Sequence, residues 1–209
     1  LWLAYFYAPP ADSGLAPLLP VSWVGLAMLV GRIVDGIADP LVGAWSDATR
    51  TRIGRRRPFM IWGALPLAAT FAALWWAPTP RSDVGRVTYL TVMVSAFLFF
   101  FTVYTAPYLA LLPELSTTLS GRVRLATWQA VAQIVGLGIA MIGSGILIDS
   151  IGFGGMGLAL AGITLATYLV TALTVREEVR AHASTPGLLQ SMALTLRNRP
   201  FLYYVGSHV

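Results

Sequence analysis

The sequence predicts an all-α polytopic membrane protein, and its composition and the distribution of its charged residues support this prediction. Of the 209 residues, 56% are apolar and only 11% are charged, whereas soluble domains carry about a quarter charged residues. The charged residues are bunched, so long uncharged stretches lie between them. Several of these stretches reach or approach the ~20 apolar residues that a helix needs to cross the ~30 Å core of a bilayer.

Five windows of this kind are expected to form membrane-spanning helices, namely residues 20–45, 59–77, 87–112, 125–148 and 155–175. Residues 1–8 are too short to span and are expected to end a first helix, so residues 1–175 would form a six-helix bundle. Residues 176–199 are polar and would link it to a second bundle, whose first helix would start within residues 200–209. This order is typical of half of a twelve-helix transporter, although an ordinary loop of a six- or seven-helix protein is the alternative.

The basic residues are all arginine, and they alternate in density from loop to loop. The segments after the second, fourth and sixth helices hold eleven arginines, and the other connections hold two. By the positive-inside bias, the arginine-rich segments are expected to be cytoplasmic in a multi-pass protein of the cell (inner) membrane. The net charge of +5 is thus explained by orientation in the bilayer, and no nucleic-acid partner is expected.

Three ionisable residues lie within the second predicted helix. Arg32, Asp35 and Asp39 are three and four residues apart, so they share one face of the helix. Each charge would cost about 3 kcal/mol at the centre of an isolated span, so this face is expected to line a polar interior. Its formal charge is −1, which a sodium ion or a proton would neutralise. A structural ion pair between Arg32 and Asp35 is the alternative for Arg32.

Uncharged polar and aromatic residues recur in the fourth and fifth predicted helices. Hydroxyl groups, amides and aromatic faces suit a neutral polyol, although such side chains in membrane helices often only bond to neighbouring helices. The candidate substrate-binding residues are Arg32, Tyr104, Thr105, Trp128, Gln129 and Gln133.

The loop between the second and third predicted helices carries an acidic residue followed by an arginine run. Asp47 lies at the C-terminal end of a helix, where the macrodipole is already negative, so we expect it to pair with a nearby arginine. Such a pair could latch one conformational state, whereas a basic run that only orients the chain is the alternative. The candidate gating residues are Gly43, Asp47, Gly54, Arg55, Arg56 and Arg57.

These segments together resemble the major facilitator superfamily. Within it, they are more narrowly similar to the glycoside–pentoside–hexuronide:cation symporters, through the pattern Arg32-x2-Asp35-x3-Asp39-Pro40-x2-Gly43-x3-Asp47-x6-Gly54-Arg55-Arg56-Arg57-Pro58. The resemblance implies the six-helix N-terminal bundle of a twelve-helix major facilitator fold. It also implies a cation site formed by Asp35, Asp39 and Thr102.

The function implied by this resemblance is secondary active transport. We expect symport of a sugar or glycoside with Na⁺ or H⁺ by alternating access, with a second transporter half required and no cofactor or metal besides the coupling ion. The alternatives are a sucrose-type proton symporter, a non-transporting receptor or scaffold, and a membrane enzyme. No enzyme is expected, because His182 and His208, the only histidines, lie outside the five complete spans.

Overall fold

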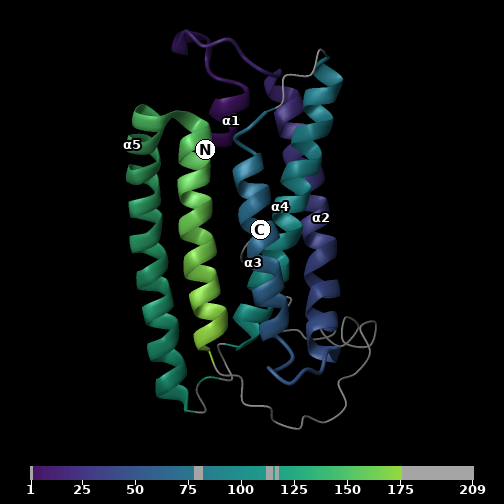
Figure 1. Ribbon diagram of the computed structural model, residues 1–209, viewed down its shortest axis with the longest axis vertical. Coiled ribbons are helices and arrows are strands. Elements are labelled where there is room, and N and C mark those ends of the chain that lie inside the picture. Colours follow the sequence, from purple (N-terminus) through teal and green to yellow (C-terminus); the bar gives the residue numbers. More distant parts are fainter. Residues whose placement is uncertain (1, 78–81, 112–114, 116–117, 176–209) are drawn as a thin grey trace, which may run out of the picture. The chain divides into compact units, whose positions relative to one another are not determined.

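The computed structural model describes residues 2–77, 82–111, 115 and 118–175, and within them the chain is helical and has no strand. The elements are α1 (Trp2–Tyr7), the short 3₁₀ helix η1 (Ala11–Ser13), α2 (Val21–Ala48), α3 (Arg57–Ala73), α4 (Asp83–Leu111) and α5 (Leu119–Thr174) (Figure 1). The all-α prediction is confirmed. The predicted linker 176–199 and the predicted start of a seventh span lie outside the described residues.

α5 is two antiparallel arms joined at a glycine. Gly152 has φ 72° and ψ 177°, a conformation that is not helical. Glycine adopts a positive φ readily because it has no Cβ. The chain reverses direction there, so the first arm (119–151) and the second arm (153–174) correspond to two separate predicted spans (Figure 1). Among the described helices, α2, α4 and α5 are long and apolar enough to cross a membrane. α3 has 17 residues, which is the lower limit of the usual length of a span.

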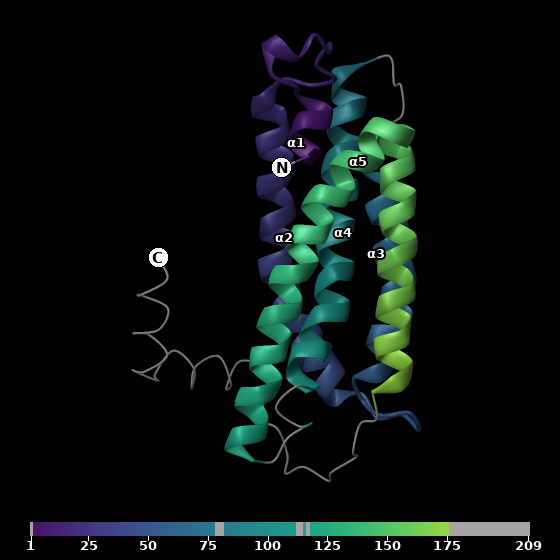
Figure 2. The ribbon, with the colours of Figure 1, turned by 90° about the vertical axis from the view of Figure 1, so that its left-hand side faces the viewer.

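The helices pack around α4, which contacts both α2 and α3, and α3 also contacts α5 (Figure 2). At Gly31 of α2 the approach to α4 is so close that an added Cβ would lie 2.7 Å from Cγ1 of Val94. A hydrogen atom is therefore all that this contact admits, and small residues at helix interfaces are typical of membrane bundles.

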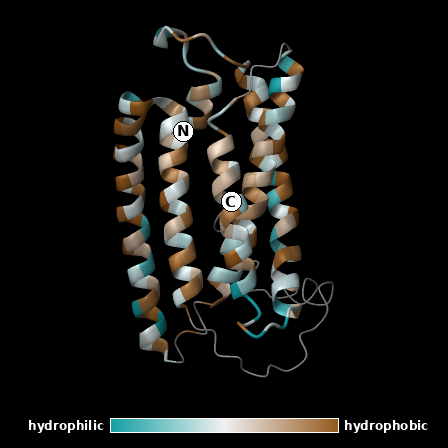
Figure 3. Ribbon diagram, in the orientation of Figure 1, coloured by the Kyte–Doolittle hydropathy of each residue, from teal (hydrophilic) through white to brown (hydrophobic). Residues whose placement is uncertain are grey.

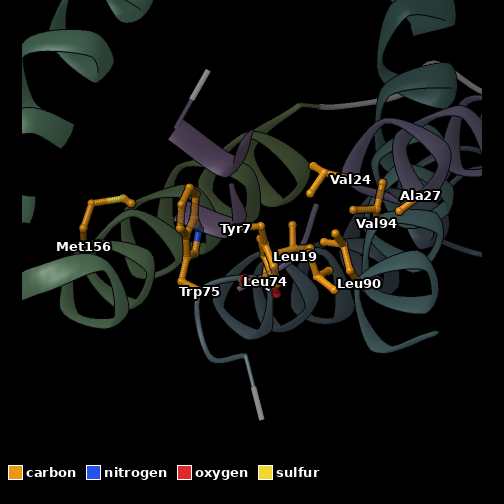
Figure 4. Close-up of a cluster of buried hydrophobic side chains, with 9 residues drawn as sticks. All are labelled: Tyr7, Leu19, Val24, Ala27, Leu74, Trp75, Leu90, Val94 and Met156. Atoms are coloured by element: carbon orange, nitrogen blue, oxygen red, sulfur yellow. Dashed lines mark hydrogen bonds between the residues drawn. The ribbon is translucent and has the colours of Figure 1, made fainter. Parts of the chain in front are cut away.

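Two clusters of buried side chains hold the bundle together at opposite ends. The first contains Tyr7, whose hydroxyl donates a hydrogen bond to the Leu74 carbonyl at 3.1 Å. The second joins α3, α4 and the second arm of α5, and its buried members include Met60, Tyr104 and Ala172. The buried residues of the first cluster, drawn in Figure 4, are Tyr7, Leu19, Val24, Ala27, Leu74, Trp75, Leu90, Val94 and Met156.

Hydrophobic residues recur along the whole length of the described helices (Figure 3). Trp62 on α3 and Ile142 on α5 are 80% and 70% exposed, and such side chains suit contact with lipid rather than water. Polar residues gather where α2, α4 and the second arm of α5 end and where α3 and the first arm begin. We call this end of the bundle the arginine-rich end. The chain is thus a membrane protein, as the composition predicted.

Candidate functional site

The polar face of α2 is organised around Asp35. The Arg32 guanidinium donates from Nη1 to Oδ2 of Asp35 at 3.4 Å, as their spacing of three residues along the helix allows. The Thr102 hydroxyl of α4 donates to Oδ1 of the same carboxylate at 2.7 Å. Thr102 is 1% exposed, so this hydrogen bond ties α2 to α4 inside the bundle.

Asp39 lies one turn beyond Asp35 on the same helix, toward the arginine-rich end. Its side chain is exposed, and among the described residues it has neither a hydrogen bond nor an ion pair. The structure therefore brings together Asp35 and Thr102 of the predicted cation site and leaves Asp39 apart from them. Two carboxylates share one guanidinium on this face, and the uncompensated charge lies at Asp39.

Arg32 also lines a cavity of about 440 Å³ between α1, α2, α3, α4 and the two arms of α5. Most of the lining is apolar, with aromatic side chains such as Trp2, Phe71 and Trp75. The Trp2 indole donates to the Ser144 hydroxyl at 2.9 Å across one side of it. The side chain of Arg32 is 74% exposed, so its guanidinium is accessible as well as paired.

Tyr104 and Thr105 face a different cavity, of about 230 Å³, between α4 and the second arm of α5. Tyr104 is buried, and its hydroxyl donates to the Tyr168 carbonyl at 3.1 Å. The Thr105 hydroxyl donates to the carbonyl of Phe101, one turn earlier in the same helix, at 2.8 Å. The cavity's other lining residues are Tyr108, Thr167, Tyr168 and Thr171.

The three candidates on the first arm of α5 line neither of these cavities. Trp128 is 68% exposed, Gln133 is also exposed, and Gln129 is half-buried. The six predicted substrate-binding residues thus lie at three separate places in the described bundle. Sequence reasoning missed the contribution of the second arm of α5, although the spacing of Thr167, Tyr168 and Thr171 already placed them along one side of a helix.

Arg56 and Arg57 of the arginine motif form hydrogen bonds with the ends of α2, α4 and α5. The Arg56 guanidinium donates from Nη2 to Oδ1 of Asp47 at 3.0 Å, and from Nη1 to the Ala110 carbonyl at the end of α4. Arg57 donates from Nε and Nη2 to the carbonyls of Ala172 and Leu173, at 3.1 and 2.9 Å. The last carbonyls of a helix lack intrahelical partners and carry the negative end of its dipole. The expected pairing of Asp47 with a nearby arginine is confirmed.

The remaining residues of the motif shape the loop between α2 and α3. Gly54 has a φ of 111°, a conformation that a side chain would strain, and its carbonyl accepts a hydrogen bond from the Thr51 hydroxyl. An added Cβ at Gly43 would meet nothing within 4 Å, so crowding among the described residues does not require glycine there. Arg55 is half-buried.

Comparison with known proteins places this geometry in a family. A family model described as "MFS/sugar transport protein" matches residues 1–208. An uncharacterized symporter of Synechocystis sp. is 29% identical over 84% of this chain and 34% of its own length. A glucuronide carrier protein homolog of Escherichia coli is 26% identical over 99% of this chain and 46% of its own.

An isoprimeverose transporter of Lactiplantibacillus pentosus is also 26% identical, over 88% of this chain and 42% of its own length. The chain therefore spans between a third and a half of these curated relatives. Because the family model covers nearly every residue, the resemblance to the major facilitator superfamily is confirmed. The chain belongs to the MFS/sugar transport protein family.

Proposed function

We propose that the full-length protein is a secondary transporter that carries a sugar or glycoside together with Na⁺ or H⁺ by alternating access. The observation that carries the proposal is the charge balance on α2, where Arg32 pairs with Asp35 and Asp39 has no partner among the described residues. Relatives named as symporters and as glycoside transporters support the same class of activity. They also favour a carrier over a membrane enzyme or a receptor.

The cation site is proposed at Asp35, Asp39 and Thr102. A carboxylate in the membrane interior costs about 3 kcal/mol unless a partner neutralises it. Asp35 receives one hydrogen bond from Arg32 and one from Thr102, so its charge is compensated without a further ion. Asp39 lies about 6 Å along the helix axis from Asp35, within reach of an ion that both carboxylates share. Binding of Na⁺ or H⁺ there would bring the net charge of the face to zero.

The substrate site is proposed to lie on the face of this bundle that meets the second transporter half. Arg32 of α2 would supply hydrogen bonds there, together with Gln129 and Gln133 of the first arm of α5, whereas Tyr104 and Thr105 of α4 would contribute from the cavity against the second arm. Trp128 would supply an aromatic face. The exposure of Trp128 and Gln133 in this chain is consistent with positions that a second half covers.

The arginine motif is proposed to act as a latch at the cytoplasmic side. Arg56 and Arg57 hold the ends of α2, α4 and α5 against the start of α3. In alternating access one end of the bundle must close while the other opens. A set of charge-assisted hydrogen bonds between helix ends would stabilise the state in which this end is closed. These hydrogen bonds would have to break or rearrange when the same end opens.

The substitution Asp39→Asn in the full-length protein tests the proposal. The neutral amide removes the need for a cation, so we expect exchange of labelled sugar across proteoliposomes to persist while accumulation against a gradient is lost. Neither a sodium nor a proton gradient should restore accumulation. Asp12→Asn is the control, because Asp12 lies in η1, outside the spans.

Gradient-driven uptake by Asp39→Asn at the wild-type level would return Asp39 to a structural role. Absence of sugar counterflow in the wild-type protein, across a panel of neutral and charged glycosides, would contradict the proposal that the protein is a sugar carrier.

A further inference from the structure

The cavity between α4 and the second arm of α5 is open on the side of the exposed Thr167 and is unusual for a membrane bundle, because every residue that lines it carries a hydroxyl group. Its volume is about 230 Å³, and among the described residues no charged side chain lines it. The six lining residues are Tyr104, Thr105, Tyr108, Thr167, Tyr168 and Thr171. Polar groups are costly within a span and need partners there, so six hydroxyl side chains around one cavity indicate more than helix packing.

The threonines of this cavity are arranged as hydrogen-bond acceptors. Thr105 and Thr171 donate to carbonyls four residues earlier, at 2.8 and 2.9 Å, and Thr167 donates to the carbonyls of Ile163 and Thr164. Because each hydroxyl hydrogen is used within its own helix, the oxygen lone pairs of Thr105 and Thr167 are left for a donor in the cavity, whereas Thr171 also contacts the Tyr104 hydroxyl. A sugar, whose hydroxyl groups are donors, matches this arrangement.

The tyrosines add aromatic surface beside these acceptors. The rings of Tyr104 and Tyr168 stack with centroids 4.0 Å apart and an interplanar angle of 17°. Tyr104 also lies 6.3 Å from Tyr108, centroid to centroid. A tyrosine side chain presents an apolar ring face and a polar hydroxyl. A sugar ring can use both, because its C–H groups pack on an apolar face and its hydroxyl groups form hydrogen bonds.

The charges around the cavity favour an uncharged ligand. Arg32, the arginine within the α2 span, lines the other cavity and is paired with Asp35. Arg57, near the end of the second arm, donates to the carbonyls of Ala172 and Leu173. A carboxylate or sulfonate brought into this cavity would therefore lose its water without gaining a cationic partner, which is strongly unfavourable.

We propose that this cavity is a binding subsite for one uncharged sugar ring near the arginine-rich end of the bundle, an inference that rests on the proposed sugar transport. Thr171 and Tyr108 lie three residues before the ends of α5 and α4, or about 4.5 Å along each axis. The subsite thus receives the sugar close to one opening of the transport path. Its volume lies below the ~300–1,000 Å³ of pockets that hold drug-sized ligands, so it accommodates a single ring.

The test uses the purified full-length protein and two probes that differ in one group, methyl β-D-glucopyranoside and methyl β-D-glucuronide. Isothermal titration calorimetry measures the dissociation constant of each. We expect the neutral glucoside to bind at least about tenfold more tightly than the glucuronide, because the cavity gives the carboxylate no partner.

Two conservative variants place the binding in this cavity. Thr167→Val and Tyr168→Phe should each weaken binding of the neutral glucoside by about threefold to tenfold, the effect of losing one hydrogen bond. Thr174→Val is the matched control and should bind as the wild type. Thr174 lies two turns further along the same helix, makes the same pair of intrahelical hydrogen bonds and does not line the cavity.

Equal or tighter binding of the glucuronide would overturn the inference, as would unchanged affinity in both Thr167→Val and Tyr168→Phe. Binding of neither probe by the wild-type protein would overturn it as well. These failures differ from failure of the proposed function. If the protein accumulates a sugar but the Thr167 and Tyr168 variants bind as the wild type, only the subsite is contradicted. If the protein binds the glucoside but shows no counterflow, the subsite stands and the protein is not a carrier.

Discussion

Gly157 on the second arm of α5 is the position where the structure allows the sharpest prediction about stability. An added Cβ there would lie 2.4 Å from Cδ1, 2.7 Å from Cγ and 2.9 Å from Cβ of Trp75. These atoms belong to the base of a side chain that is only 7% exposed and stacks on Phe153. Trp75 therefore cannot swing away, and Gly157→Ala must push α5 apart from the turn that follows α3.

The expected magnitude follows from a comparison with Gly162→Ala. Alanine favours a helix over glycine by about 1 kcal/mol at either position, whereas an added Cβ at Gly162 meets nothing within 4 Å. The difference between the two variants thus isolates the clash, and overpacking of this kind costs about 1–3 kcal/mol.

The assay is thermal unfolding of each full-length variant in one detergent at one heating rate, because membrane proteins often unfold irreversibly and the midpoint then depends on the rate. Gly157→Ala should have a midpoint at least ~2 °C below that of Gly162→Ala. Equal midpoints, or a more stable Gly157→Ala, would refute the close packing of Trp75 against α5.

Two further predictions concern the arginine-rich end. Arg56→Gln should lower the free energy of unfolding by roughly 2 kcal/mol, between the values typical of exposed and buried ion pairs, because it leaves Asp47 without its partner. Arg52→Gln is the exposed control, and equal thermal midpoints for the two variants would show that the ion pair contributes nothing. Cysteines at Thr51 and Asp83 should react with an impermeant thiol reagent from the cytoplasmic and the external side respectively. Labelling of position 51 from outside intact cells would reverse the proposed orientation.

The properties that the sequence alone determined are those carried within a single helix. Length and hydropathy placed the spans, because crossing a bilayer requires a fixed number of apolar residues. Even the two arms of α5 were separated correctly, on either side of Gly152. The pairing of Arg32 with Asp35, an alternative that the sequence left open, agrees with their spacing, and Asp47 required a cation because it ends a helix.

Which side chains of different helices meet was decided only by the tertiary structure. Asp35 and Asp39 share a face, yet the Thr102 hydroxyl bonds to Asp35 and not to Asp39. Tyr104 and Thr105 lie against the second arm of α5, away from Trp128, Gln129 and Gln133. Helical periodicity fixes the direction of each side chain relative to its own axis. The rotation and depth of one helix against another depend on side-chain packing, as at Gly31 and Gly157, where the absence of a Cβ permits close approach.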